Sequence, residues 1–158
     1  MSTFTLIHVL ISLVAIGSGL AVTFGFLTSR RLEGWTLLFL AMTLATSVTG
    51  FFFPFHGFTP AIGVGILSMV VLTAAIAARY SFRLQGFWRS VYVVGATTAL
   101  YFNVFVLIVQ SFQKIGALKT LAPIRSEPPF LITQGAALLI FLALGALAVR
   151  RFRPTART

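Results

Sequence analysis

The chain has 158 residues, of which 58% are hydrophobic and only 9% are charged. A soluble domain of this length needs a polar surface that such a composition cannot supply, so a soluble globular protein is excluded. The net charge of +10 would favour nucleic-acid binding on a soluble protein, but here it is typical of the basic loops that set membrane topology. The absence of cysteine excludes disulfides, thiol redox chemistry and thiolate metal sites.

Five apolar segments follow one another along the chain, each close to the length of about 20 residues that crosses a bilayer. The first segment has no basic region before it and is long for the core of a signal peptide, so we expect a retained helix. Pro54 ends the second segment, because proline cannot continue a helix. The sequence predicts an all-α integral membrane bundle that forms a single domain over residues 1–158. Its transmembrane helices are expected at residues 4–27, 35–53, 61–78, 91–112 and 130–149.

The basic residues divide unequally between the two sides of this expected bundle. One side carries nine of the 12: Arg30, Arg31, Arg79, Arg83, Arg89, Arg150, Arg151, Arg153 and Arg157. The other side carries Lys114, Lys119 and Arg125. Because short basic loops stay in the cytoplasm, we expect the N-terminus outside and the C-terminus in the cytoplasm. A four-helix alternative, with one segment lying in the membrane interface, would split the basic residues less cleanly.

The helix interiors are expected to contain no charged side chain. The two acids, Glu33 and Glu127, lie outside the apolar segments, and Arg79 is expected in the polar connection after the third helix. A proton or cation pump usually needs a titratable group within the membrane, so this pattern disfavours one. An interfacial aromatic belt is expected on the cytoplasmic side, formed by Trp35, Tyr80, Trp88 and Tyr92.

Uncharged polar residues gather toward the outer half of the bundle. His8 shares one face of the first helix with Ser12, Ala15 and Gly19, which predicts that its imidazole points into the bundle. We therefore expect His8 to contact a polar residue of the fourth or fifth helix. The combined residues predict an outward-facing pocket lined by His8, His56, Asn103, Gln110, Glu127 and Gln134. Imidazole binds metal ions and haem, so a small ligand, a metal or haem is one interpretation, but the sequence does not point strongly to any particular cofactor.

Each of these residues also has a purely structural interpretation. His8 can join two helices by a hydrogen bond, and the amides of Asn103 and Gln110 can serve in helix packing. Glu127 can stabilise the start of the last helix, for which Ser126 is the expected cap. His56 lies in an aromatic turn, where it can simply be solvated. Two histidines are also few for a closed metal site, which usually has about four ligands.

The long outer loop has the sequence QKIGALKTLAPIRSEPP. Ile115, Leu118 and Leu121 recur in it at helical spacing, which predicts a short amphipathic turn lying on the membrane surface. Such a turn would roof the outer pocket, and the alternative is an ordinary surface loop.

Two stretches, LYFNVFVLIVQSFQKIGALKTLAPIRSEPPF and TSVTGFFFPFHGFTPA, resemble small multi-pass bacterial inner-membrane proteins of an uncharacterised family. The resemblance extends along most of the chain. It implies a multi-pass protein of the bacterial inner (plasma) membrane, and it carries over no activity and no functional residue.

Three classes of function stay open. An accessory or assembly subunit of a larger membrane complex is favoured for a chain of this size, and a non-enzymatic role is favoured over an enzyme. A ligand-, metal- or haem-binding protein that uses the outer pocket near His8 and His56 is the first alternative. A small oligomeric transporter or channel is the second. The expected partners are the lipid bilayer and other membrane subunits or further copies of this chain, but no nucleic acid.

Overall fold

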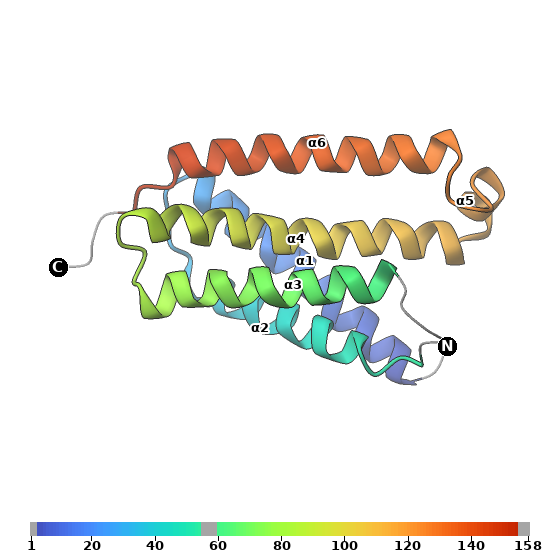
Figure 1. Cartoon of the computed structure of the whole chain (residues 1–158), viewed down its shortest axis with the longest axis horizontal. Helices are drawn as coiled ribbons and strands as arrows, with labels where there is room; N and C mark the ends of the chain where they lie inside the picture. Colours follow the sequence, from blue (N-terminus) through green and yellow to red (C-terminus); the bar gives the residue numbers. More distant parts are fainter. Residues whose placement is uncertain (1–2, 55–59, 155–158) are drawn as a thin grey trace.

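The computed structural model describes residues 3–54 and 60–154, apart from the side chains of residues 60 and 61. Within these ranges the chain is helical and contains no strand (Figure 1). The elements are α1 (Thr3–Leu27), α2 (Glu33–Gly50), α3 (Pro60–Ile76), the π-helical turn η1 (Ala77–Ser81), α4 (Phe87–Lys114), α5 (Gly116–Leu121) and α6 (Pro128–Arg151).

Four helical segments among the described residues are long and apolar enough to cross a membrane, which confirms the prediction in its coarser form, an all-α chain with several candidate membrane-spanning helices. They are Thr3–Leu27, Ile62–Ser81, Phe87–Lys114 and Pro128–Arg151. The helix α2 is not among them. It has 18 residues, begins with the charged Glu33 and contains several threonines, which lower its mean hydropathy.

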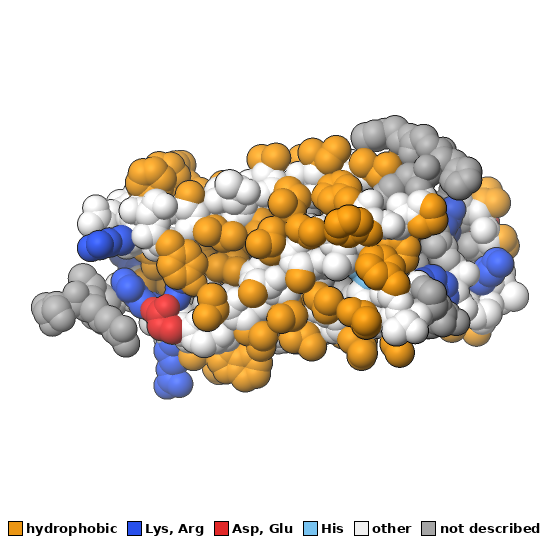
Figure 2. All heavy atoms as spheres, turned by 90° about the horizontal axis from the view of Figure 1, so that it is seen from below, with side chains coloured by type: hydrophobic (Ala, Val, Ile, Leu, Met, Phe, Trp, Pro, Cys, Tyr) orange, Lys and Arg blue, Asp and Glu red, His pale blue; other side chains and the backbone are white. Residues whose placement is uncertain are grey.

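The long helices lie side by side along the long axis of the molecule and alternate in direction (Figure 1). The α1–α2 and α3–α4 connections lie at one end, together with the end of α6, and we call this the basic end. It carries Arg30, Arg31, Arg79, Arg83, Arg89, Arg150, Arg151 and Arg153. The opposite end, which we call the α5 end, holds the start of α1, the short helix α5 and the basic residues Lys114, Lys119 and Arg125. Hydrophobic side chains cover the face between the two charged ends (Figure 2).

The core lies where α1, α2 and α3 pack around α4, and Ala148 and Phe152 at the C-terminal end of α6 complete it. Nine side chains or glycines of α4 are buried, including Tyr92 and Leu100, whereas α6 buries only Gln134 and Ala148. At Gly19, α1 packs closely against side chains of α2 and α4. A Cβ at this position would lie 2.6 Å from Leu100 Cδ1 and 2.8 Å from Phe39 Cε2. A small residue is therefore required where α1 crosses α2 and α4. Ala15 is also buried, so the predicted small-residue face of the first helix is the packed face.

The third helix differs most from its predicted boundaries. It does not end at Ala78 but continues through the π-helical turn η1 to Ser81. The wider turn is held by the N–H of Phe82, which donates to the carbonyl of Ala77 at 3.0 Å. The prediction that Arg79 lies in a polar connection was wrong, because this turn keeps Arg79 helical and buries it.

Other helix ends also differ from the predicted ones. The second helix runs from Glu33 to Gly50, so it starts two residues earlier and ends three residues earlier than expected. The fourth helix starts at Phe87 and the last at Pro128, and each extends beyond its apolar stretch into the interface. The cap residue of α6 is Glu127, so the prediction that Ser126 caps this helix was wrong. Proline fits the first position of α6, where no backbone N–H is needed.

Candidate functional site

His8 lies on α1 near the α5 end and bonds to α2. Its Nδ1 is 2.7 Å from the hydroxyl oxygen of Thr49, and that hydroxyl in turn donates to the carbonyl of Ala45 at 2.7 Å. With its proton used in this way, the Thr49 oxygen accepts from Nδ1–H of the imidazole. The ring also meets Phe53 edge-on, with centroids 5.1 Å apart. The imidazole points toward a neighbouring helix as expected, but its hydrogen-bond partner comes from α2, not from α4 or α6.

The amide side chains of Asn103 and Gln134 also connect helices. Asn103 is buried on α4 and donates through Nδ2 to the hydroxyl of Thr43 on α2 at 3.1 Å. Gln134 of α6 donates through Nε2 to the carbonyl of Phe105 on α4 at 3.2 Å. The Gln134 Oε1 is buried without a hydrogen-bond partner. Gln110 is partly buried on α4. Both bonded amides therefore stabilise helix pairs through polar contacts that are common within membranes.

Glu127 organises the connection between α5 and α6. Its two carboxylate oxygens accept hydrogen bonds from the backbone N–H groups of Ile124, at 3.1 Å, and Ser126, at 3.0 Å. Desolvation would raise the pKa of this carboxyl, but backbone hydrogen bonds, first among them that from Ile124, together lower the pKa below its ordinary value. The contacts agree with the structural interpretation of Glu127 as a residue that fixes the start of the last helix.

The candidate residues of the outer pocket do not bond to one another within the described part of the chain. Their hydrogen bonds go instead to Thr43, Thr49, the carbonyl of Phe105 and the α5–α6 connection. His56 lies outside the described residues. Within residues 3–54 and 60–154, no three His, Cys, Asp or Glu side chains lie close enough together to hold a metal ion. The outer pocket and its ligand therefore stay predictions.

A buried arginine at the basic end is the most unusual polar feature of the bundle. The Arg79 side chain is only 4% exposed, and its Nη2 lies 2.5 Å from Oε2 of Glu33 at the start of α2. The guanidinium carbon also lies over two aromatic rings, 5.1 Å from the centroid of Tyr92 and 5.7 Å from that of Tyr80. Burying a charge within a membrane protein is costly unless it is paired. The ion pair and the rings provide that compensation, while Nη1 is buried without a hydrogen-bond partner.

Tyr92 links this arginine to an aromatic cluster. Its ring is fully buried, packs edge-on against Phe26 of α1 with centroids 5.4 Å apart, and lies 6.2 Å from Phe152 after α6. Its hydroxyl lies 3.5 Å from that of Thr36 on α2. The prediction that Tyr92 belongs to an interfacial aromatic belt was therefore wrong, because the ring lies in the core between four helices.

Arg89 has a similar connecting role on the other side of the basic end. From the first turn of α4, its Nη1 donates to the backbone carbonyls of Val149, at 2.8 Å, and Phe152, at 2.5 Å. These carbonyls lie at the C-terminal end of α6, where the helix dipole favours a positive charge. Through these contacts Arg79 and Arg89 connect α2, α3, α4 and α6 at the basic end.

Sequence reasoning missed the Arg79–Glu33 pair, although one signal pointed to it. Both residues adjoin the same predicted side of the membrane, and Glu33 is the only acid on that side. An acid among nine arginines is the natural partner for whichever one becomes buried. The sequence did not show that a π-helical turn would direct Arg79 inward.

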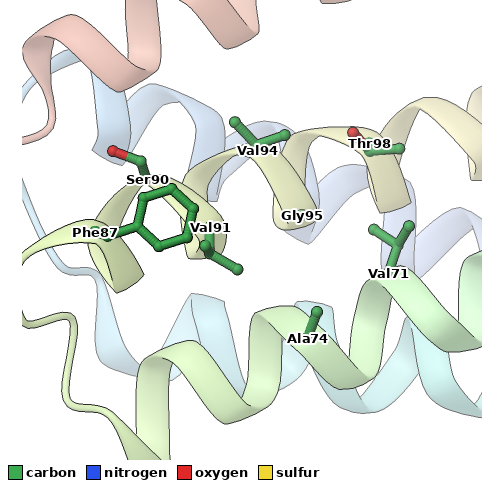
Figure 3. A pocket seen from close by; sticks show the side chains of 8 residues that line it. All are labelled: Val71, Ala74, Phe87, Ser90, Val91, Val94, Gly95 and Thr98. Carbon is green, nitrogen blue, oxygen red and sulfur yellow. The ribbon is translucent and has the colours of Figure 1, made fainter.

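Two shallow apolar grooves flank the outward face of α4. The larger groove, about 330 Å³, lies between α3 and α4, and its lining residues include Val71, Ala74, Phe87 and Thr98 (Figure 3). The smaller groove, about 200 Å³, lies between α4 and α6, and Thr98, Tyr101 and Leu142 contribute to its walls. Thr98 borders both grooves. Their apolar walls suit hydrocarbon groups better than polar substrates.

No known protein family matches this chain, and neither the curated proteins nor the solved structures contain a significant match to it.

Proposed function

We propose that the chain is an accessory or assembly subunit of a larger membrane complex, in which α6 packs against a transmembrane helix of another protein. The observation that supports this is the weak engagement of α6 with its own bundle. It has 24 residues, yet only Gln134 and Ala148 are buried. It packs on α4 and α1, and its hydrogen bonds to α4 through Gln134 and Arg89 lie near its two ends.

The face of α6 offers both large and small side chains to a neighbouring helix. Leu139 is 68% exposed and Leu142 is 61% exposed, and Ala136 and Ala143, which flank them on the same helical face, are also exposed. Small residues let helix backbones approach closely, and in lipid such packing replaces the hydrophobic driving force of water. The groove between α4 and α6 adds a recess for a side chain of the partner.

Site-specific photo-crosslinking in native membranes tests this proposal. A photoreactive residue at Leu139 or Leu142 should give one adduct of defined mass above the 17.2 kDa chain. A photoreactive residue at Leu20, which is 52% exposed on α1, is the matched control and should not give that adduct. Ala143→Trp should abolish the adduct from Leu139 by blocking close approach.

The other outcomes would overturn the proposal in distinct ways. An adduct at twice the mass of the chain would favour a homo-oligomer and with it the transporter or channel alternative. Lipid adducts alone would mean that α6 faces the bilayer without a partner. A visible absorbance band of the purified protein that disappears in His8→Ala, while the protein stays folded, would favour the ligand-binding alternative.

We also propose that α2 crosses the bilayer as a fifth helix, with the N-terminus outside and the C-terminus in the cytoplasm of a bacterial inner membrane. The support is that α2 packs alongside α1 (Figure 1) and that the basic end carries most of the arginines. Because the chain has no cysteine, Ser2→Cys and Thr155→Cys are clean reporters. In intact cells an impermeant thiol reagent should label the first and not the second. The opposite labelling would reverse the orientation, and labelling of both would favour four crossings.

A further inference from the structure

The groove between α3 and α4 has the length of one membrane leaflet. Its walls on α4 run from Phe87 to Thr98, which corresponds to about 16 Å of helix. One leaflet contributes half of a hydrocarbon core of about 30 Å. The groove begins at the basic end, where α4 starts, so it covers the hydrocarbon depth next to the arginine-rich side (Figure 3).

The walls of this groove fit a flexible hydrocarbon chain. The small side chain of Ala74 leaves the groove open, and Val71 and Val94 provide apolar contact (Figure 3). Gly95 lets α4 approach α3 closely, because a Cβ at this position would lie 3.0 Å from the Cβ of Ala75 and 3.3 Å from the carbonyl oxygen of Val71. At the basic end, Phe87 is 75% exposed and its ring borders the groove.

The connection that leads into this groove holds a free cation at its surface. Arg83 is exposed and forms no ion pair or hydrogen bond within the described part of the chain, whereas Arg79 and Arg89 are occupied by Glu33 and by carbonyls of α6. Arg83 precedes Phe87 by four residues. Ser90, one turn further on, lines the groove.

The backbone of this connection is strained at Arg83 and at the residue that follows it. Arg83 and Leu84 both adopt positive φ, at 50° and 60°, which non-glycine residues rarely do. The buried side chain of Leu84 and its N–H, which donates to the carbonyl of Ala78 at 3.0 Å, maintain this conformation. Phe82 also stacks on Trp88 with ring centroids 3.7 Å apart. The backbone at Arg83 therefore has a defined conformation four residues before Phe87, the first residue of the groove wall on α4.

We infer that this groove binds an anionic phospholipid. One acyl chain lies between α3 and α4, and the headgroup phosphate binds Arg83 at the basic end. Basic residues beside transmembrane helices attract anionic headgroups, and a guanidinium recognises phosphate through paired hydrogen bonds. This site is separate from the α6 face of the proposed assembly function, and either can exist without the other.

Native mass spectrometry of the full chain in detergent, after delipidation, tests the inference. Phosphatidylglycerol should rebind more tightly than phosphatidylcholine with the same acyl chains, and inorganic phosphate alone should not compete at millimolar concentration. Arg83→Gln should weaken phosphatidylglycerol binding about fivefold, as expected for one basic residue at an anionic lipid surface. The matched control Arg30→Gln removes an exposed arginine from the α1–α2 connection and should leave binding unchanged.

Separate variants test whether the acyl chain lies in the groove. Ala74→Trp fills the groove from the exposed side of α3 and should reduce binding of both lipids. If that variant does not fold, Thr98→Leu narrows the far end of the groove and should reduce binding of long acyl chains more than short ones.

Four results would overturn the inference. Equal binding of the two lipids would remove the anionic specificity, and equal effects of Arg83→Gln and Arg30→Gln would remove Arg83 from the site. Full competition by inorganic phosphate would mean that the ligand is a free anion. A photoreactive residue at Ala74 that captures a polypeptide and no lipid would show that a partner helix occupies the groove.

Discussion

The basic end and the α5 end of the bundle are held together by different chemistry. At the basic end, Arg79 and Arg89 each contact several groups, and the aromatic cluster around Tyr92 fills the space between the helices. At the α5 end, His8 forms a single hydrogen bond to α2, and the short helix α5 buries no side chain. From this comparison we expect charged residues that are shared between several helices to hold the helix ends of this bundle more firmly than an isolated neutral hydrogen bond does.

The same comparison explains where a partner or a lipid can bind. A guanidinium that is already bonded within the protein is not available to an external anion. Among Arg79, Arg83 and Arg89, only Arg83 is therefore free to bind one. The α5 end leaves apolar side chains such as Ile115 and Leu121 exposed, which suits a helix that lies on the membrane surface.

Substituting either member of the Arg79–Glu33 ion pair should change the free energy of unfolding most. The two substitutions should differ in size. Glu33→Ala leaves the buried guanidinium of Arg79 without its partner and should lower the free energy of unfolding by about 3 kcal/mol. Arg79→Met leaves a Glu33 side chain that is half exposed and stays solvated, so it should cost only about 1–2 kcal/mol. Reversible unfolding in mixed micelles measures both, with Arg30→Met as the control for an exposed arginine. The opposite order would mean that Arg79 is stabilised mainly by the aromatic rings.

Stability in the middle of the bundle should be sensitive to substitution of Gly19 but not of the nearby Gly17. Gly19→Val forces atoms into Leu100 and Phe39, both of which are buried, and should destabilise the bundle by about 2–3 kcal/mol. Gly17→Ala meets no atom within 4 Å and should be neutral or slightly stabilising, because alanine favours a helix. The same unfolding measurement separates them. Equal stability of the two variants would contradict the close approach of α1 to α2 and α4.

The sequence predicted features that depend on local pattern. Hydropathy located each long helix, and the spacing of Ala15 and Gly19 identified the packed face of α1, because both signals repeat within one segment. The spacing of Ile115 and Leu121 likewise predicted the helical turn that became α5. These features require no knowledge of which helices are neighbours.

The contacts between helices could not be predicted in the same way. The helical phase of His8 indicated an inward direction but could not show that Thr49 of α2 lies opposite it. The inward direction of the Arg79 side chain depends on the π-helical turn that contains it. Such a turn changes the helical phase and leaves no clear mark in the sequence. The core position of Tyr92 depends on its packing against Arg79 and Phe152, which come from other segments of the bundle.

Removing the hydrogen bond at the α5 end should have a smaller effect than breaking the ion pair. Thr49→Val keeps the shape of the side chain but removes the oxygen that accepts from His8. A double-mutant cycle with His8→Phe should give a coupling energy of about 0.6–1 kcal/mol, the usual size for a hydrogen bond between membrane helices. Thr73→Val on the exposed side of α3 is the matched control and should show no coupling with His8→Phe. If the coupling energy between His8 and Thr49 equals that between Arg79 and Glu33, the basic end is not held more strongly than the α5 end.

The smallest effect is expected in the α5–α6 connection, and it should depend on pH. Because the pKa of Glu127 is lowered in the folded protein, its carboxylate stabilises the connection at pH values above its ordinary pKa. This stabilisation should be lost as the pH falls through the lowered pKa, when protonation weakens the hydrogen bonds from Ile124 and Ser126. Hydrogen exchange of these two amides, corrected for intrinsic rates, should lose protection in acid, whereas Glu127→Gln should show weak protection at every pH. The amide of Phe152, which donates to the carbonyl of Ala148 at the basic end, is the internal control and should keep its protection in Glu127→Gln. If Ile124 and Ser126 exchange equally fast in both proteins at neutral pH, the carboxylate does not hold this connection, and α5 and α6 are joined by the chain alone.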